Sequence, residues 1–477
     1  MRSIARAMLG VAVAATTLAA AVEVLPVGVA QAAPSVPGLD NPAVVHQAAL
    51  DGSLAKTHHA ISLCAGGSGN AAGKYLPADC DMSLVASASD ATKPLAVSGP
   101  VGLGPADFAR AFHLPDTPGK AGTVGILAFG ATPTLASDLA TYRSQYGLPA
   151  CTEASGCLKI VGKDGGAPPA PLGLPILNQA DEFLAMESAL DVEMVSASCP
   201  ECQIRVVELS PLLVIPQYAY LPAVTADAMD DGVDTAIGLG ANAVSISYDI
   251  ANGIQPGIAT GTQAQRLHHP GVAIVAAAGD HGVQQGTMNQ VWPQEVPWVT
   301  SAGGVQITST DGGNTFNKSV WDDGNGEGNL YWSAASSCSD YIPPAVGQPA
   351  SVAAYCGGHR ASTDASAVAT NVSIYDTYQP ATGGAGGWGV AMGTSAASPY
   401  LAGLYVRAGT AGVDGPNTLY AASAAGNGSI ENVTTGTNMP NGAADCTKAN
   451  LPTVLCVAGP GWNGPTGVGV PDGLGAF

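Results

Sequence analysis

The feature that most constrains the fold is an alternation of short apolar runs with helix-like segments through the middle of the chain. The apolar runs are rich in β-branched residues and are bounded by glycine. A buried parallel sheet with crossover helices requires this pattern, because its strands are covered on both faces. We therefore predict an α/β fold with a doubly wound, mostly parallel sheet and helices on both faces. The expected strands lie at 123–129, 204–209, 243–247 and 272–278, and the expected helices at 135–146, 218–237 and 264–268.

The composition excludes several classes of partner. The chain has 477 residues, with 16 Lys and Arg against 36 Asp and Glu, and its formal net charge of −20 argues against nucleic acids and phosphate groups as ligands. Hydrophobic residues make up 46% of the chain and charged residues only 11%, so we expect an ordinary buried core and no global disorder.

The first residues predict export. Two arginines precede an apolar run at 7–22, and an A-x-A cleavage pattern follows at 30–32. This is typical of a signal peptide, which we place at residues 1–32. A permanent membrane anchor is the competing interpretation, but Glu23 and Pro26 end the run short of the ~20 residues that a spanning helix needs. We expect a secreted, extracellular protein that has no membrane association after cleavage.

Ten cysteines fall into five neighbouring pairs, which in an exported chain indicates disulfides. The C-x-x-C formed by Cys199 and Cys202 could instead be a redox motif or half of a zinc site, but no second C-x-x-C exists and no histidine lies close in the sequence. A structural disulfide is therefore favoured. The predicted bridges are Cys64–Cys80, Cys151–Cys157, Cys199–Cys202, Cys338–Cys356 and Cys446–Cys456.

Residues 33–98 differ from the rest of the chain. They are rich in Ala, Gly, Ser and Asp and show no sustained helical or strand period. We expect a short N-terminal segment that is wrapped on, or linked to, the larger part at 99–477.

A doubly wound sheet gathers function at the carboxyl ends of its strands. The run that ends at residue 278 is followed by Gly279-Asp280-His281-Gly282, which puts a carboxylate in a tight loop at this edge. Taken alone, Asp280 is more typical of a turn or cap residue than of a catalytic group.

A second candidate site lies at 393–399, with the sequence G-T-S-A-A-S-P. Ser395 would stand at a helix start, where backbone N–H groups and the positive end of the helix dipole could stabilise an oxyanion, so it is placed to be a nucleophile. The alternative is a Ser or Thr that only caps an ordinary helix. A nucleophilic serine needs a base; His281 is a possible one, although it lies in no motif typical of a catalytic histidine.

Glu187 and Asp191 offer a different base. They are spaced i, i+4 in a strongly helical stretch, so both carboxylates lie on one helix face. Such a pair is either solvated on the surface or shares a proton in a buried site, which raises one pKa and suits catalysis at acid pH.

Glu187, Asp191, Asp280 and Ser395, in this order, resemble the sedolisin family of serine-carboxyl peptidases. The resemblance implies a subtilisin-like fold for residues 99–477, with Ser395 as nucleophile, Glu187 as general base and then acid, Asp191 supporting Glu187, and Asp280 facing the oxyanion. Ser247, Tyr248 and Asp249 would then flank the substrate cleft. Further stretches that are similar to the family lie at 102–108, 245–248, 300–304 and 458–462.

The chain departs from the family in its N-terminal part and at Asp249. Residues 33–98 are too few for the family's prodomain, so the chain either folds without one, uses a reduced one, or does not activate itself by cleavage. Asp249 stands where the family usually has Gly, and could narrow the cleft, favour a basic or amino group on the substrate, interfere with backbone pairing, or simply be solvated.

The family's calcium site resembles two stretches, at 432–436 and 459–463. The possible ligands would be Asn432, Val433, Gly459, Gly461 and Asn463, but Asn stands at both positions where the family has Asp. Because calcium affinity rises with ligand charge, we expect no calcium and no other cofactor. The Cys446–Cys456 bridge could supply rigidity instead.

Together these features predict a secreted, acid-acting serine-carboxyl peptidase that hydrolyses protein or peptide substrates through an acyl-serine intermediate. Endopeptidase activity is favoured over tripeptidyl peptidase activity, and we expect a monomer. The alternatives are an inactive secreted binding or surface module on the same scaffold, and a histidine-based hydrolase that uses His281.

Overall fold

The computed structural model describes residues 41–54, 60–62, 79–80, 83–85, 99–214, 222–251, 256–285, 291–323, 331–380 and 386–477. The expected signal peptide and the expected Cys64–Cys80 bridge lie outside the described residues.

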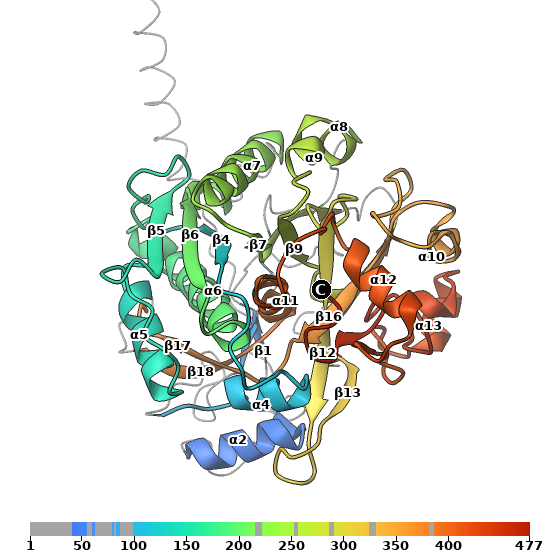
Figure 1. Cartoon of the computed structure of the whole chain (residues 1–477), viewed down its shortest axis with the longest axis horizontal. Helices are drawn as coiled ribbons and strands as arrows, with labels where there is room; N and C mark the ends of the chain where they lie inside the picture. Colours follow the sequence, from blue (N-terminus) through green and yellow to red (C-terminus); the bar gives the residue numbers. More distant parts are fainter. Residues whose placement is uncertain are drawn as a thin grey trace, which may run out of the picture. The chain divides into compact units, whose positions relative to one another are not determined.

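A twisted, mostly parallel sheet forms the centre of the protein (Figure 1). Its strands pair in the order β13-β12-β9-β7-β4-β6-β5, with β16 also pairing with β12; all pairings are parallel except that of β13 with β12. The strand bounds are β4 Thr123–Phe129, β5 Leu158–Gly162, β6 Gln203–Leu209, β7 Ala243–Ile246, β9 Ala273–Ala277, β12 Val299–Thr308, β13 Asn317–Val320 and β16 Ala365–Val368. The α/β fold class is therefore confirmed.

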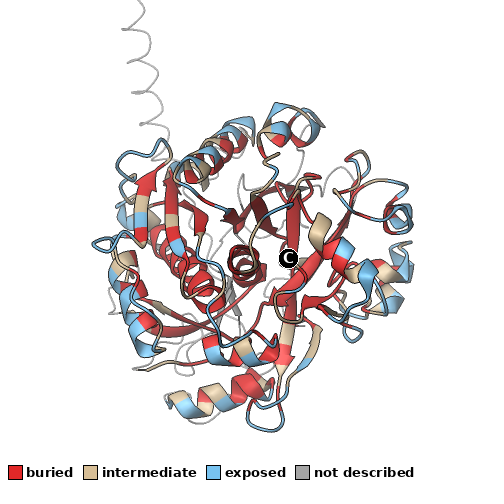
Figure 2. Ribbon diagram, in the orientation of Figure 1, coloured by how far each residue is buried: buried red, intermediate tan, exposed pale blue. Residues whose placement is uncertain are grey.

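Helices cover both faces of this sheet. α7 (Pro222–Gly238) packs on β4, β6 and β7, while α6 (Asn178–Ser198) and α11 (Thr394–Ala408) pack against each other on the other face (Figure 1). A Cβ at Gly403 of α11 would collide with the Ser198 hydroxyl of α6, so glycine allows the two helices to approach closely. As Figure 2 shows, α11 is buried along almost its whole length.

Most of the predicted elements are present. The strand expected at 123–129 has those bounds, and the helix expected at 135–146 is α5 (Leu135–Gln145). The prediction of a helix at 264–268 was only partly right, because α9 (Thr262–Arg266) has five residues and ends at Arg266.

The N-terminal part contains elements that its composition did not reveal. Asn41 caps α2 (Pro42–Leu50) by accepting a 3.0 Å hydrogen bond from the Ala43 N–H, and Pro42 occupies the first turn, where its missing N–H costs nothing. The expectation of no sustained period was wrong for this helix. Three short strands follow: β1 (Ala60–Ser62), β2 (Asp79–Cys80) and β3 (Ser83–Val85).

Smaller sheets surround the centre. They are β10-β14-β15, β11-β8-β2, β1-β3-β18-β17 and β19-β20. Their remaining bounds are β8 Tyr248–Ala251, β10 His281–Gln285, β11 Val291–Trp292, β14 Ser333–Cys338, β15 Ala361–Ser362, β17 Val372–Asp376, β18 Gly387–Met392, β19 Ile430–Glu431 and β20 Val470–Pro471. The other helices are α4 Pro105–Ala111, α8 Pro256–Thr260, α10 Ala350–Ala353, α12 Asn417–Ala425 and α13 Ala443–Lys448. Within the described ranges, no helix combines the length and apolarity that crossing a bilayer would take.

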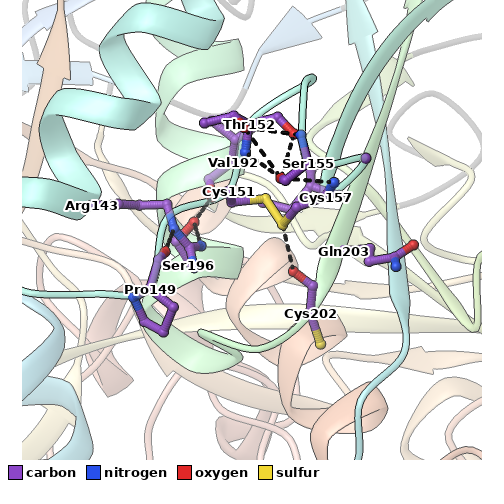
Figure 3. Close-up of a disulfide and its surroundings, with 12 residues drawn as sticks. Arg143, Pro149, Cys151, Thr152, Ser155, Cys157, Val192, Ser196, Cys202 and Gln203 are labelled. Atoms are coloured by element: carbon purple, nitrogen blue, oxygen red, sulfur yellow. Dashed lines mark hydrogen bonds between the residues drawn. A yellow bond between two sulfur atoms is a disulfide. The ribbon is translucent and has the colours of Figure 1, made fainter.

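Four of the predicted disulfides are formed: Cys151–Cys157, Cys199–Cys202, Cys338–Cys356 and Cys446–Cys456. Beside the first of them, the buried Arg143 joins α5 to α6 (Figure 3). Its guanidinium donates to the Pro149 carbonyl (2.6 Å), the Ser196 hydroxyl (2.8 Å) and the Pro200 carbonyl (2.6 Å). This contact fixes the end of α6 that lies next to Cys199.

Candidate active site

Ser395 is the second residue of α11, directly after β18. The helix is preceded by Gly393, whose φ of 143° is a conformation that favours glycine and turns the chain from the strand into the helix. The N-cap is therefore Gly393, and the interpretation of Ser395 as a mere cap is not supported. Ser395 is fully buried in the described structure.

The Asp280 side chain contacts the first residue of the same helix. Its Oδ1 accepts hydrogen bonds from the Thr394 N–H (2.8 Å) and the Thr394 hydroxyl (2.9 Å), while that hydroxyl accepts one from the Gly279 N–H (3.0 Å). Asp280 follows β9. These hydrogen bonds therefore connect the loop at the carboxyl end of a central strand to Thr394, the residue before Ser395. Both of these bonds from Thr394 reach the same carboxyl oxygen, Oδ1.

Glu187 and Asp191 lie on α6, which is buried from residue 181 to its end. Neither side chain is exposed, so the surface alternative for this pair was wrong. Burial, and then the charge of Asp191, raises the pKa of Glu187 well above its usual value. Burial likewise raises the pKa of Asp191 well above its usual value, so both carboxyls of the pair are harder to ionise than in water.

Ser247 lies between the carboxyl pair and Ser395. Its hydroxyl donates a 2.6 Å hydrogen bond to Asp191 Oδ1, and it lies 3.4 Å from the Ser395 carbonyl oxygen. That carbonyl receives no helical hydrogen bond from residue 399, because Pro399 has no N–H.

The hydroxyls of Ser247 and Ser395 both face Glu187 and lower its pKa in part. Within the described part of the chain, neither Glu187 oxygen receives an aligned hydrogen bond, and the Ser395 hydroxyl instead lies 3.5 Å from the Ser247 carbonyl. In enzymes, catalytic hydrogen bonds are often long or poorly aligned until the substrate binds.

The next two residues of this segment begin β8. The Tyr248 ring is buried against Phe129, with 4.8 Å between ring centroids. Asp249 is also buried and accepts a 3.2 Å hydrogen bond from the Gln294 side chain, so the alternative of a solvated carboxylate was wrong.

His281 lies in β10, with its ring 4.6 Å from that of Trp332. The hydroxyl and carboxyl groups of Ser247 and Glu187 face Ser395.

In the two stretches that resemble a calcium site, asparagine side-chain amides donate hydrogen bonds to backbone carbonyl oxygens. Asn432 Nδ2 donates to the Gly461 carbonyl (2.7 Å), and Asn463 Nδ2 donates to the carbonyls of Val433 and Gly459 (3.2 Å each). These are the three carbonyl oxygens that would have to bind the ion. A donor N–H directed at each of them does not fit a cation, which needs oxygen lone pairs on every side.

Two contacts were not predicted from the sequence: that of Thr394 with Asp280, and that of the Ser247 hydroxyl with Asp191. The signal for Thr394 was present, because it lies between the turn glycine and Ser395, but its contact with Asp280 spans 114 residues. No pattern within the sequence predicts a pairing at that separation.

No protein-family model matches the chain, and no curated protein sequence matches it. Among solved structures, it is similar to Pseudomonas sedolisin, a serine-carboxyl proteinase complexed with two molecules of pseudo-iodotyrostatin, with 20% identity and a TM-score of 0.59 over 79% of this chain and 96% of that one. A structure described as an S41 psychrophilic protease matches with 15% identity and a TM-score of 0.43 over 78% of this chain and 98% of that one. The first likeness shows that the chain has the subtilisin-like α/β fold.

Proposed function

We propose that this protein is a serine-carboxyl peptidase of the sedolisin type, which hydrolyses peptide bonds in protein substrates at acid pH. The observation that carries the proposal is the Ser395 hydroxyl at the start of a buried helix, facing the buried Glu187–Asp191 pair, with Asp280 fastened to the preceding residue. The subtilisin-like fold and the residue types at all four positions support it.

In the proposed reaction, Ser395 Oγ attacks the substrate carbonyl carbon and its proton passes to Glu187. The carbonyl oxygen becomes an oxyanion, which accepts hydrogen bonds from a protonated Asp280 and from a backbone N–H at the start of α11. Glu187 then returns the proton to the leaving amine, and an acyl-serine remains. Water attacks this ester with Glu187 again as base, releasing the acid and restoring the Ser395 hydroxyl.

Acid conditions follow from these roles. Asp280 can donate to the oxyanion only while it is protonated, whereas the Glu187–Asp191 pair must lose one proton to act as base. Burial and the mutual repulsion of the pair raise the pKa of Glu187, so the base retains enough basicity to accept the serine proton.

The proposal includes secretion and endopeptidase action on protein chains by a monomer without calcium. Four disulfides are compatible with an oxidising compartment. The signal-like sequence at 1–32 supports export.

The test is cleavage of an unfolded protein between about pH 2 and pH 8, the range in which carboxyl and imidazole groups titrate. We expect activity below about pH 5 that is lost in Ser395→Ala and in Glu187→Gln. Ser398→Ala is the matched control, because Ser398 is buried in the same helix and bonds to Ser245 and the Val275 carbonyl rather than to the carboxyl pair. Absence of Ser395-dependent cleavage by the folded protein would refute the proposal.

A further inference from the structure

A buried carboxyl that the proposed mechanism does not use lies close to the candidate site. Asp323 is 5% exposed, and within the described part of the chain neither of its side-chain oxygens has a hydrogen-bond partner. Burial, and then the negative charge of Asp322, raises the pKa of Asp323 to about 7. Ionising this carboxyl is therefore costly unless a donor or a positive charge approaches it.

Backbone hydrogen bonds connect Asp323 to the loop that carries Asp280. The Asp323 N–H donates to the Trp332 carbonyl (2.9 Å), and Asp322 pairs with Ser333. On its other side, Ser333 pairs with His281, and its N–H donates to the Asp280 carbonyl (2.8 Å). Asp322 and Asp280 thus lie two strand spacings apart, about 10 Å, which is the length of about three residues of extended peptide.

Other acidic groups surround Asp323. Burial, and then Asp322, raises the pKa of Tyr331, and the charges of Asp323 and Asp445 add to the effect, so the Tyr331 hydroxyl lies near all three carboxyls. Asp445, on α13, is paired with Lys448 at 2.8 Å. Asp322 is exposed and Tyr331 is half-buried, so a ligand can approach from solvent on this side.

An organic cation fits these surroundings. A positive charge stabilises a carboxylate that lies among other acids, and the guanidinium of Arg and the ammonium of Lys also donate hydrogen bonds to it. In the described ranges, no three His, Cys, Asp or Glu side chains are arranged to hold a metal ion. The site therefore suits a basic side chain better than a metal.

We propose that Asp323 binds a Lys or Arg side chain of the substrate, so that the peptidase prefers a basic residue within about three positions of the bond that it cleaves. This inference rests on the proposed peptidase function and names a substrate class for it. Only the ionised carboxyl attracts a cation, so the preference grows as pH rises toward about 7. The other titratable groups around Asp323 are Asp322, Tyr331, Asp445 with its partner Lys448, and His281, whose ring contacts that of Trp332.

The first test uses the full chain with Ser395→Ala, so that it measures binding and not hydrolysis. The probe is benzamidine, a planar cation, and benzamide is its uncharged counterpart of nearly the same shape. Each is titrated at about pH 5 and at about pH 7.5, below and above the pKa of Asp323, and followed by ligand-observed NMR. The test variant is Asp323→Asn, and the matched control is Asp340→Asn, which changes an exposed carboxyl beyond the end of β14.

We expect benzamidine to bind the parent at least roughly tenfold more tightly at the higher pH, because its affinity follows the ionised fraction of Asp323. Benzamide should show no such change. At the higher pH, Asp323→Asn should bind benzamidine at least about tenfold more weakly than the parent, whereas Asp340→Asn should match the parent. Near-UV circular dichroism verifies that each chain is folded at both pH values.

The second test uses chains that retain Ser395 and maps the bonds that they cleave in a mixture of unfolded proteins, by mass spectrometry. Lys and Arg should be enriched near the cleaved bonds, more at about pH 5 than at about pH 3. Asp323→Asn should lose this enrichment and continue to cleave beside uncharged residues.

Equal affinity of the parent for benzamidine and benzamide at the higher pH would overturn the proposal, and this comparison does not depend on any variant at position 323. Cleavage sites with the same content of Lys and Arg in the parent and in Asp323→Asn would also overturn it. Absence of all cleavage would refute the peptidase function separately, because every chain in the binding test lacks the Ser395 hydroxyl.

Discussion

The Ser247 hydroxyl donates a 2.6 Å hydrogen bond to Asp191 Oδ1, at the point where the end of β7 meets α6. This bond lowers the pKa of Asp191 against the effect of burial, and the same hydroxyl also lowers the pKa of Glu187. In the proposed mechanism Ser247 therefore positions the carboxyl pair, in addition to its place at the start of the proposed substrate-binding segment.

Ser247→Ala should raise the pKa of the pair, because the group that stabilises the ionised form is removed while burial is unchanged. If Glu187 is the base, the acid limb of the kcat/KM profile should move to higher pH. Ser247→Thr keeps a hydroxyl and should restore the profile. Ser245→Ala, two residues earlier in β7 and bonded to Ser398, should leave the profile in place. An unshifted acid limb in Ser247→Ala would argue against Glu187 as the base.

Asp280→Asn and Asp280→Ala distinguish a hydrogen-bond donor from a base. An amide keeps an oxygen for the two bonds from Thr394 and donates to the oxyanion at every pH, whereas alanine does neither. We expect Asp280→Ala to lower kcat by about 10²–10³-fold. Asp280→Asn should retain more activity than the alanine variant and extend it to higher pH. Equal inactivity of the two variants across the pH range would contradict the donor role.

The sequence predicted the centre of the fold because strands such as β4 are buried on both faces and must be apolar throughout. The four candidate catalytic residues were proposed from short local motifs, and their roles from the resemblance of those motifs, in their order, to the sedolisin family. The sequence could not predict β2 and β3, because strands of two and three residues have no period to detect. The burial of Asp249 was equally hidden, since it depends on Gln294, 45 residues away.

The asparagine amides in the C-terminal stretches predict that the thermal stability of the protein does not depend on calcium. Because Asn432 and Asn463 donate to the carbonyls that would bind the ion, we expect the same Tm in millimolar calcium and in EDTA. Changing both residues to Asp replaces these donors with carboxylates, which should cost about 1–3 kcal/mol per bond lost and make the Tm rise with added calcium. Terbium luminescence gives a separate measure of ion binding. A calcium-dependent Tm in the unchanged chain would show that the amides do not replace the ion.

The buried carboxyls predict that stability decreases as pH rises. α6 carries five acidic residues and no basic one, and burial raises the pKa of Glu193 well above its usual value, with the nearby Asp138 and Asp376 adding to the effect. Burial also raises the pKa of Glu208 and of Asp323 to about 7, and that of Asp230 to about 8.

Since these folded-state pKa values exceed those of the unfolded chain, the folded protein holds protons that the unfolded chain has already lost. The free energy of unfolding should therefore be greatest below about pH 4 and decrease from there to about pH 8, by about 1.4 kcal/mol for each unit by which a pKa is raised. Urea denaturation at a series of pH values measures this slope. Glu193→Gln removes one ionising group and keeps an oxygen for the Tyr375 N–H, so its slope should be smaller, whereas the exposed Glu153→Gln should match the parent. A slope that Glu193→Gln leaves unchanged would mean that Glu193 does not contribute, and that the loss of stability comes from the other buried carboxyls or from the net charge of −20.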